Sequence, residues 1–117
     1  MSDPQCLFCA IVAGRIPATV VGRGDHVLAF RDLDPQAPTH VLVVPFQHHR
    51  DVAVLAAQAP EALAELVGLG SAIAAQECPD VDGAFRLVFN TGAAAGQSVF
   101  HVHGHVLAGR PFGWPPG

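Results

Sequence analysis

Three histidines alternate along a short segment near the C-terminal end of the chain: His101, His103 and His105. The period of two in a β-strand would place them on one face, about 6.6 Å apart, with Val102 and Val106 turned toward the core. Protonated imidazoles this close repel one another, so their pKa values should separate and at least one should be neutral at pH 7. A neutral imidazole whose Nδ1–H is held by a carbonyl offers a lone pair on Nε2, which can attack phosphorus or coordinate a metal. The competing interpretation is a histidine-rich edge strand without a function.

Two of the three cysteines, Cys6 and Cys9, stand in a C-x-x-C motif. This spacing is typical of metal ligands, and a four-coordinate structural zinc site would need two more donors. The alternative is a pair of buried, reduced thiols. We do not expect a thioredoxin-like redox function, because the motif does not stand at a strand-to-helix junction within a βαβ unit. Cys78 is expected to be an ordinary residue at a helix end.

The composition excludes several classes of protein. The chain has 117 residues, half of them apolar, with six arginines, seven histidines, no lysine and a net charge of −4. Without lysine it cannot be a P-loop NTPase or a pyridoxal-phosphate enzyme. The net acidity argues against duplex nucleic acid as a partner. No stretch is apolar enough to span a membrane and the N-terminus does not resemble a signal peptide, so a cytoplasmic location is expected.

The pattern along the chain predicts five strands, one long helix and one short helix. The long helix is expected over 60–76, where apolar residues recur every three or four positions after Pro60. The short helix is expected over 6–13, before Gly14. The predicted strands cover 19–21, 26–31, 39–45, 85–90 and 97–108, and the tail 110–117 is expected to be irregular. Short loops between consecutive strands imply hairpins, so the prediction is an α+β fold with an antiparallel sheet.

The histidine motif resembles the signature of the histidine triad (HIT) superfamily, in which three histidines alternate with apolar residues. The resemblance implies a single HIT domain over residues 1–117. Other segments are similar to the Hint branch of nucleotide-binding phosphoramidases: 6–17, 28–45, 96–99 and the closing Trp-Pro-Pro-Gly of 114–117.

Two positions depart from the family pattern. Gly104 stands where an apolar residue is expected. It lies on the core face of the predicted strand, so we expect altered packing and no loss of chemistry. Arg31 stands where the most similar Hint proteins often carry histidine, which bears on base specificity.

The resemblance implies a covalent reaction at phosphorus. His103 would attack the α-phosphorus of a nucleoside 5′-phosphoramidate, expel the amine and form a nucleotidyl-histidine, and water would then release the nucleoside monophosphate. His105 and the backbone N–H groups of Gly96–Ser98 would hold the non-bridging oxygens. Ser98 would lie near the leaving group as a proton source, although strict strand alternation places it on the face opposite the histidines. Its alternative role is a turn-capping serine.

Further residues are implied in nucleotide binding or in support of the histidines. Asp32 would accept the ribose hydroxyls and Asn90 would contact the bridging atom or the ribose, unless they are an exposed loop aspartate and a turn-forming asparagine. His40 is either a hydrogen-bond partner of a triad histidine or a satisfied core histidine. The remaining candidates would form a base pocket or a phosphate loop: Phe8, Ile16 and Leu33, and Gly96, Gln97, Ser98 and Val99. Burial in the core is the alternative for Phe8, Ile16 and Leu33.

The resemblance also completes the cysteine site. Its two further zinc ligands would be His48, which follows Pro45 by three residues, and the first triad histidine, His101. His49 could replace His48. The zinc would be structural, because the reaction described above requires no cofactor.

A homodimer is the expected assembly. The apolar face of 63–73 could cover the sheet alone or also contact a second subunit, and the resemblance implies a ten-stranded sheet across a two-fold axis with Trp114 near the partner's site. Two alternative functions stay open at this point. One is a dinucleoside polyphosphate hydrolase of the fragile histidine triad type. The other is a nucleotide- or metal-binding module without enzymatic activity.

Overall fold

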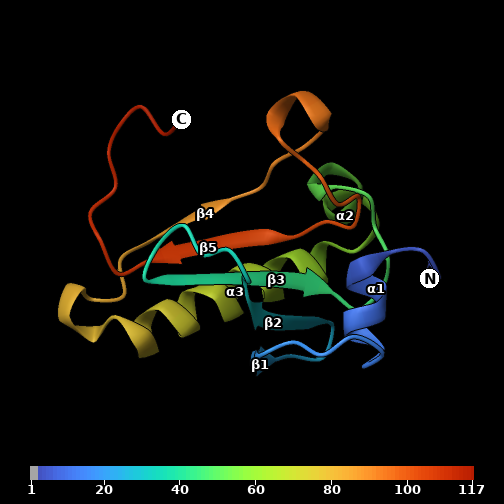
Figure 1. Ribbon diagram of the computed structural model, residues 1–117, viewed down its shortest axis with the longest axis horizontal. Helices are drawn as coiled ribbons and strands as arrows, with labels where there is room; N and C mark the ends of the chain where they lie inside the picture. Colours follow the sequence, from blue (N-terminus) through green and yellow to red (C-terminus); the bar gives the residue numbers. More distant parts are fainter. Residues whose placement is uncertain (1–2) are drawn as a thin grey trace.

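The computed structural model describes residues 3–117, and its centre is a five-stranded antiparallel sheet in the order β1-β2-β3-β5-β4 (Figure 1). The strands are β1 (Val20–Arg23), β2 (Val27–Arg31), β3 (Thr39–Pro45), β4 (Phe85–Val88) and β5 (Gly104–Ala108). The helices are α1 (Leu7–Val12), α2 (Val52–Gln58) and α3 (Pro60–Glu77), with short 3-10 turns at Pro79–Val81 and Ala93–Ala95. The α+β fold predicted from the sequence is confirmed.

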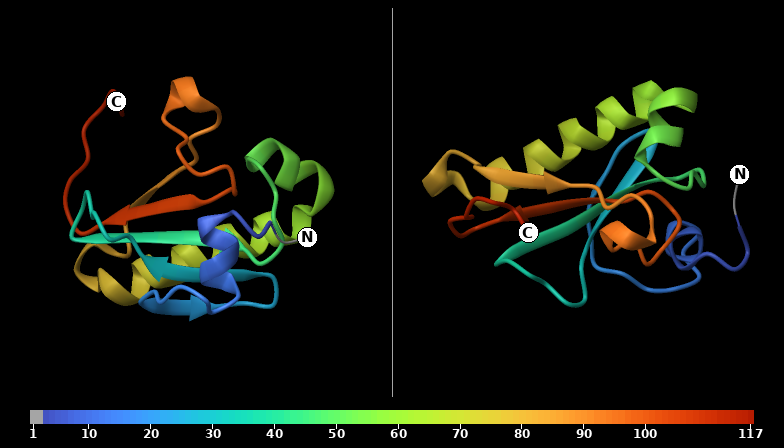
Figure 2. Two further views of the ribbon diagram at one scale, coloured as in Figure 1. Left: turned by 45° about the vertical axis from the view of Figure 1, so that its right-hand side comes forward. Right: turned by 90° about the horizontal axis from the view of Figure 1, so that it is seen from above.

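The sheet separates two apolar clusters, and β3 contributes to both because all seven of its residues are buried. Val41 and Val43 pack under α3, whereas Leu42 and Val44 pack with Phe8 of α1. Seen along the sheet, α3 lies on one side and α1 and the loop around residues 93–99 lie on the other (Figure 2). The two faces of the sheet therefore differ: the long helix covers one, and the other is available for the histidines.

Helix α3 begins and ends for local reasons. Pro60 stands in its first turn, where a missing N–H is tolerated, and Glu61 is favourably placed near the positive end of the helix dipole. Pro79 follows Cys78 and ends the helix. The apolar stripe that includes Leu66 and Ile73 is buried against the sheet. The predicted helix over 60–76 is thus correct to within one residue.

Helix α2 was not predicted. Its N-cap is Asp51, whose side chain accepts a hydrogen bond from the N–H of Val54 at 3.0 Å, and Leu55 is its one buried residue. A helix this short carries little periodic signal, and the capping aspartate before an apolar run was the one available indication. The chain therefore has two short helices and one long helix.

The last predicted strand, 97–108, is wrong over its first seven residues. Its pairing with β3 reaches only from Thr39–Ala108 to Val43–Gly104. Before Gly104 the backbone binds elsewhere, since the N–H of Val102 donates to the carbonyl of His49 at 2.7 Å. The side chains before Gly104 nevertheless still alternate between the two faces of the sheet. Val102 packs in the core under α3, as do residues of β5.

Arg31 lies on the α3 side of the sheet, away from α1. Both terminal nitrogens of its guanidinium donate to the carboxylate of Glu77 at the end of α3, and Thr39 donates to the same carboxylate at 3.0 Å. The residue therefore joins β2 to α3. The position of Arg31 gives no support to the expected effect on base specificity.

Across the described residues, no helix is long and apolar enough to cross a membrane.

Gly104 is closely surrounded, so a larger residue should destabilise the fold. A Cβ at this position would lie 3.0 Å from Leu66, 3.1 Å from Leu87 and 3.2 Å from Phe89. We expect Gly104→Val to lower the free energy of unfolding by about 1–3 kcal/mol through overpacking, as measured by urea denaturation.

Gly68 provides the matched control, because it lies on the exposed face of α3 and a Cβ there meets nothing within 4 Å. Gly68→Ala should stabilise the chain by about 0.5–1 kcal/mol through helix propensity. A Gly104→Val variant as stable as the parent chain would contradict the close packing around Gly104.

Candidate active site and metal centre

His103 holds its proton on a defined nitrogen. Its side chain is buried, and Nδ1 lies 2.8 Å from the backbone oxygen of His101. A carbonyl oxygen only accepts hydrogen bonds, so Nδ1 carries the proton and Nε2 carries the lone pair. The second triad histidine thus has the tautomer that a nucleophile needs.

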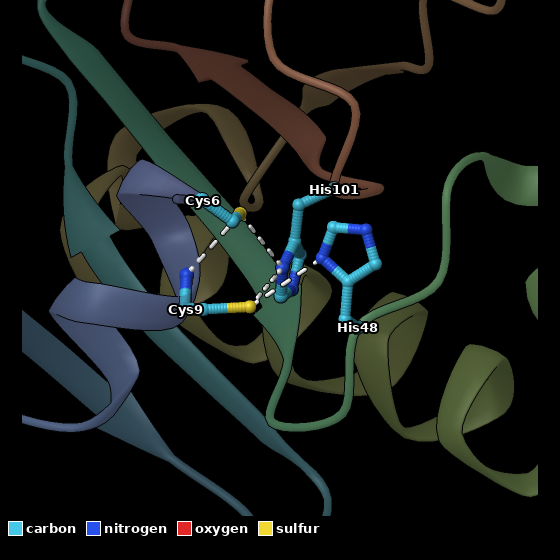
Figure 3. A group of neighbouring side chains, drawn as sticks. All are labelled: Cys6, Cys9, His48 and His101. Carbon is cyan, nitrogen blue, oxygen red and sulfur yellow. Dashed lines mark hydrogen bonds between the residues drawn. The ribbon is translucent and has the colours of Figure 1, made fainter. Parts of the chain in front are cut away.

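His101 has the opposite tautomer and belongs to a different cluster. Its Nε2 lies 2.9 Å from the carbonyl oxygen of Pro45 and therefore carries the proton. Its Nδ1 lone pair faces the sulfurs of Cys6 and Cys9, at 3.5 and 3.4 Å (Figure 3). The imidazole of His101 is therefore directed to the cysteines.

His105 receives its orientation through His40. The backbone N–H of Gln36 donates to Nδ1 of His40 at 2.9 Å, so His40 carries its proton on Nε2. That nitrogen lies 2.9 Å from Nδ1 of His105 and 3.5 Å from the carboxylate of Asp32. His105 consequently accepts at Nδ1 and carries its proton on Nε2, which is buried without a partner among the described residues. The expected contact between His40 and a triad histidine is present, and it leaves a free donor on His105.

Burial keeps these histidines neutral at pH 7. Loss of solvation, together with the neighbouring imidazoles, lowers the pKa of His101 and of His105 to about 4. Burial also lowers the pKa of His103 and of His40, although the nearby Asp32 carboxylate opposes this in both cases. All three triad histidines are therefore neutral at pH 7, in agreement with the expectation that at least one of them is.

The loop from Gly92 to Val99 offers fewer backbone donors than expected. The N–H groups of Gly96 and Gln97 already donate within the loop, to the carbonyls of Ala93 and Gly92. Among the described residues, the N–H groups of Ser98 and Val99 have no such acceptor. Of the three amides predicted to bind phosphate oxygens, only that of Ser98 is available, and that of Val99 adds a second.

Gln97 supports this loop with its side chain. Its Oε1 accepts from the N–H of Gly92 at 2.9 Å, and its Nε2 donates to the carbonyls of Arg50 at 2.8 Å and of Val99 at 3.2 Å. The side chain is buried and fully bonded. Gln97 was expected to bind the nucleotide. In the structure its side chain instead holds the loop together through these hydrogen bonds.

Ser98 lies in the irregular segment, so strand alternation does not decide its direction. It is exposed and lines a cavity of about 320 Å³ with His48 and Phe100. Asn90 is half-buried just beyond the end of β4. No hydrogen bond joins Ser98 or Asn90 to a triad histidine among the described residues, and their roles stay predictions.

The three residues expected to form a base pocket differ in position. Phe8 is buried, and its ring lies edge-on to His103 with the centroids 4.9 Å apart. Ile16 is 38% exposed and Leu33 is 99% exposed, so both have surface to offer a ligand. Only Phe8 is in contact with the triad.

The cysteine cluster fits a tetrahedral metal ion. Sγ of Cys9 lies 3.4 Å from Nδ1 of His48 and 3.4 Å from Nδ1 of His101 (Figure 3). With zinc bonds of 2.3 Å to sulfur and 2.0–2.1 Å to nitrogen, a regular tetrahedron separates these donors by about 3.6 Å. All four ligand atoms lie within 4.8 Å of one another. The donor set and its spacing therefore suit zinc.

The structure also decides between the two adjacent histidines. His48 faces the sulfurs, whereas the buried Nδ1 of His49 has no partner among the described residues. The backbone carbonyl of His49 instead accepts from Val102. Of the two histidines, His48 lies in the cysteine cluster, as the main prediction had it, and His49 does not.

The donor atoms of a second cluster, Asp32, His40 and His105, also lie within 4.8 Å of one another. Their spacing does not fit a metal ion. The two nitrogens are 2.9 Å apart. Two nitrogen ligands on a tetrahedral zinc would lie about 3.3 Å apart. The shorter distance is that of a hydrogen bond with one shared proton. This cluster is therefore a hydrogen-bond relay, and its geometry does not support a metal bound between His40 and His105.

Two partners of the histidines could not be found from residue types. The carbonyl of Pro45 and the N–H of Gln36 set the tautomers of His101 and His40. Both are backbone groups, which every residue except proline supplies in full, and so they leave no signal in a sequence.

Fold and site together define an antiparallel sheet that carries a cluster of buried histidines next to a Cys₂His₂ cluster of metal-ligand type. The HIT domain family model matches residues 13–112, and the chain belongs to the HIT family. An Escherichia coli protein named purine nucleoside phosphoramidase is 40% identical over 109 residues, which cover 93% of this chain and 91% of that protein. A 14 kDa zinc-binding protein of Zea mays is 40% identical over 121 residues, covering 100% of this chain and 91% of that protein. The crystal structure of a HIT family hydrolase from Legionella pneumophila superposes with a TM-score of 0.89 at 43% identity, covering 97% and 100% of the two chains.

The depressed pKa values of the histidines predict a loss of stability in mild acid. His105 takes up a proton near its ordinary pKa of 6.5 in the unfolded chain but only near 4 in the folded chain. Below pH 6.5 the unfolded state therefore binds more protons, and the free energy of unfolding falls as the pH is lowered. Urea midpoints of chelator-treated protein at pH 7, 6 and 5 should decrease in that order.

His105→Gln is the informative variant, because an amide keeps an acceptor and a donor but does not titrate. Its midpoint should fall less steeply over the same pH range than that of the parent chain. Midpoints independent of pH in the parent chain would show that the buried histidines are not kept neutral by the fold.

Proposed function

We propose that this protein hydrolyses nucleoside 5′-phosphoramidates through a nucleotidyl intermediate on His103. The observation that carries the proposal is the pairing of two tautomers. Nε2 of His103 holds a lone pair, and the neighbouring ring of His105, with its centroid 5.0 Å away, holds an unpartnered Nε2–H. A nucleophile therefore lies beside a donor for a phosphate oxygen. The similarity to the E. coli phosphoramidase supports this class of substrate within the HIT family of hydrolases.

The reaction has two displacement steps. In the first, Nε2 of His103 bonds to the α-phosphorus, the P–N bond breaks, and the departing nitrogen keeps the electron pair and takes a proton, for which exposed Ser98 is the proposed source. In the second, water bonds to phosphorus, the bond to His103 breaks, and the proton lost by the water returns to the Ser98 oxygen. Nε2–H of His105 and the free amides of Ser98 and Val99 would stabilise the charge on the non-bridging oxygens in both steps.

Phosphate is handled here without lysine. The chain has none, and no arginine takes part in the histidine cluster described above. Neutral imidazole and amide donors in a buried site replace a cation, since hydrogen bonds are stronger where water is excluded. Asp32 and Asn90 would bind the ribose or the bridging atom, and Phe8, Ile16 and Leu33 would contact the purine.

We propose that zinc is held by Cys6, Cys9, His48 and His101, as a structural ion. The tetrahedral spacing supports this, as does the similarity to the zinc-binding maize protein. The bound ion would require deprotonated cysteines and the neutral His101 tautomer described above. A cytoplasmic location, where thiols stay reduced, is consistent with the three free cysteines of the chain.

A homodimer is the proposed assembly. Strand β4 is an edge strand with all four residues half-buried, and Trp114 is 83% exposed. An open edge of this kind can pair with its own copy across a two-fold axis to give a ten-stranded sheet. Trp114 of one subunit would then lie near the amine pocket of the other.

Light scattering after size exclusion should give twice the 12.2 kDa mass of one chain. Trp114→Ala should leave that mass unchanged and raise KM for phosphoramidates of bulky amines more than for that of ammonia, because only a bulky amine reaches the indole. A monomeric mass at micromolar concentration would contradict the dimer.

Removal of the nucleophile should abolish the proposed activity. His103→Ala is expected to lower kcat for an adenosine phosphoramidate such as AMP-lysine by more than about 10³-fold, because no other group supplies the attacking lone pair. The parent enzyme, quenched during turnover, should carry an added AMP on His103 by mass spectrometry.

His26→Ala is the matched control, since His26 is an exposed histidine whose ring pairs with Glu65 away from the triad. It should retain full activity. Release of AMP that survives His103→Ala would disprove the mechanism, and a preference for diadenosine polyphosphates would favour the alternative hydrolase.

A further inference from the structure

His101 belongs to both sites at once. Its Nδ1 faces the two sulfurs, its Nε2–H donates to Pro45, and its backbone carbonyl accepts from Nδ1 of His103 at 2.8 Å. The side chain is fully buried. A shift of the His101 backbone toward or away from the cysteines would therefore displace the carbonyl that orients the proposed nucleophile.

Helix α1 is attached to the rest of the domain through the same cluster. Across residues 3–117, every hydrogen bond that links α1 to a residue outside the N-terminal segment 3–16 passes through the sulfur of Cys6 or Cys9, to His48 or His101. Hydrogen bonds to thiol sulfur are weak. A metal ion would replace them with coordinate bonds and would hold the helix far more firmly.

Phe8 lies between the two cysteines on α1. It packs edge-on against His103, with the ring centroids 4.9 Å apart, and against Phe30 of β2, at 5.7 Å. The helix thus brings one side of the proposed nucleoside pocket to the sheet. Phe8 is adjacent in sequence to Cys9 and two residues from Cys6, so a bond at either sulfur restrains the backbone that carries it.

We propose that metal and nucleotide bind this chain cooperatively, because the metal at Cys6, Cys9, His48 and His101 clamps α1 and so holds both Phe8 and the orientation of His103. The inference rests on the proposed function only in placing the nucleotide beside His103. It assigns the metal centre a task beyond stability, namely control of nucleotide affinity.

Cooperativity of this kind is reciprocal. If the metal raises the affinity for a nucleotide by some factor, the nucleotide raises the affinity for the metal by the same factor. Coupling between two sites in one domain typically amounts to about 5- to 150-fold. The nucleotide should therefore hold the metal in place, which can be observed without any turnover.

The test begins with the zinc-loaded, folded protein and measures the rate at which zinc passes to an excess of a chromogenic chelator. Saturating AMP should slow this release at least about fivefold. Adenosine, which has no phosphate to bind free zinc, should slow it in the same direction. Calorimetry should show AMP binding more tightly to zinc-loaded than to metal-free protein. A release rate unchanged by both ligands would overturn the proposal.

Two variants distinguish the effect of AMP on zinc release through α1 from a general change in stability. Phe8→Leu removes the aromatic contact but no metal ligand, so zinc release without nucleotide should stay within about twofold of the parent rate while the effect of AMP is largely lost. Cys78→Ala, at a buried cysteine that is not part of the metal cluster, should retain the full effect of AMP. A Phe8→Leu variant with the full AMP effect would overturn the role given to α1.

The outcomes also distinguish the clamp from the proposed function. If AMP binds with equal affinity to loaded and metal-free protein, the clamp is wrong and the nucleotide-binding function stands. If AMP does not bind the loaded protein, both are wrong. If the chain binds no zinc while AMP-lysine is hydrolysed, the cooperativity and the structural zinc are both wrong, and the phosphoramidase activity stands.

Discussion

The site depends on backbone carbonyl oxygens that can accept a hydrogen bond but never donate one. The carbonyl of His101 obliges His103 to keep its proton on Nδ1, and the carbonyl of Pro45 obliges His101 to keep its proton on Nε2. Two histidines separated by one residue thereby acquire opposite tautomers. The lone pair of His103 has no partner among the described residues, and that of His101 faces the cysteines.

Burial preserves these tautomers, because it keeps the imidazoles neutral. An exposed histidine is partly protonated near pH 7, and a protonated ring has no lone pair. Here the pKa of His103 is lowered and that of His105 falls to about 4, because the sheet, Phe8 and the surrounding loops exclude water. The relay from Gln36 through His40 then ensures that the one uncommitted atom of His105 is a donor. The cluster therefore presents a hydrogen-bond donor and a lone pair side by side, and all its imidazoles are neutral.

The two faces of the sheet divide these tasks. The face under α3 carries most of the apolar core, and Gly104 allows β5 to approach Leu66, Leu87 and Phe89 closely. The opposite face carries the histidines and the short helix α1. Stability and chemistry thus depend on different residues, so substitutions under α3 should act on folding more than on the histidine cluster.

Much of this molecule could be predicted from the amino-acid sequence, because the signals were local. The spacing of apolar residues after Pro60 determined α3, and the alternation of histidine and valine determined which side chains face α1 and which face the core. The C-x-x-C motif indicated the metal site, and the histidine motif indicated the family. Each of these patterns lies within a few residues of one segment.

Tertiary structure alone decided the rest, because the deciding partners are distant in sequence and are mostly backbone groups. The hydrogen bond from Val102 to the carbonyl of His49 ends the ladder at Gly104, so a strand predicted over 97–108 is only five residues long. The choice of His48 over His49 depends on where α1 places Cys9. The tautomers of three histidines depend on Pro45, Gln36 and the carbonyl of His101. A carbonyl is present at every position, so only the fold determines which ones meet an imidazole.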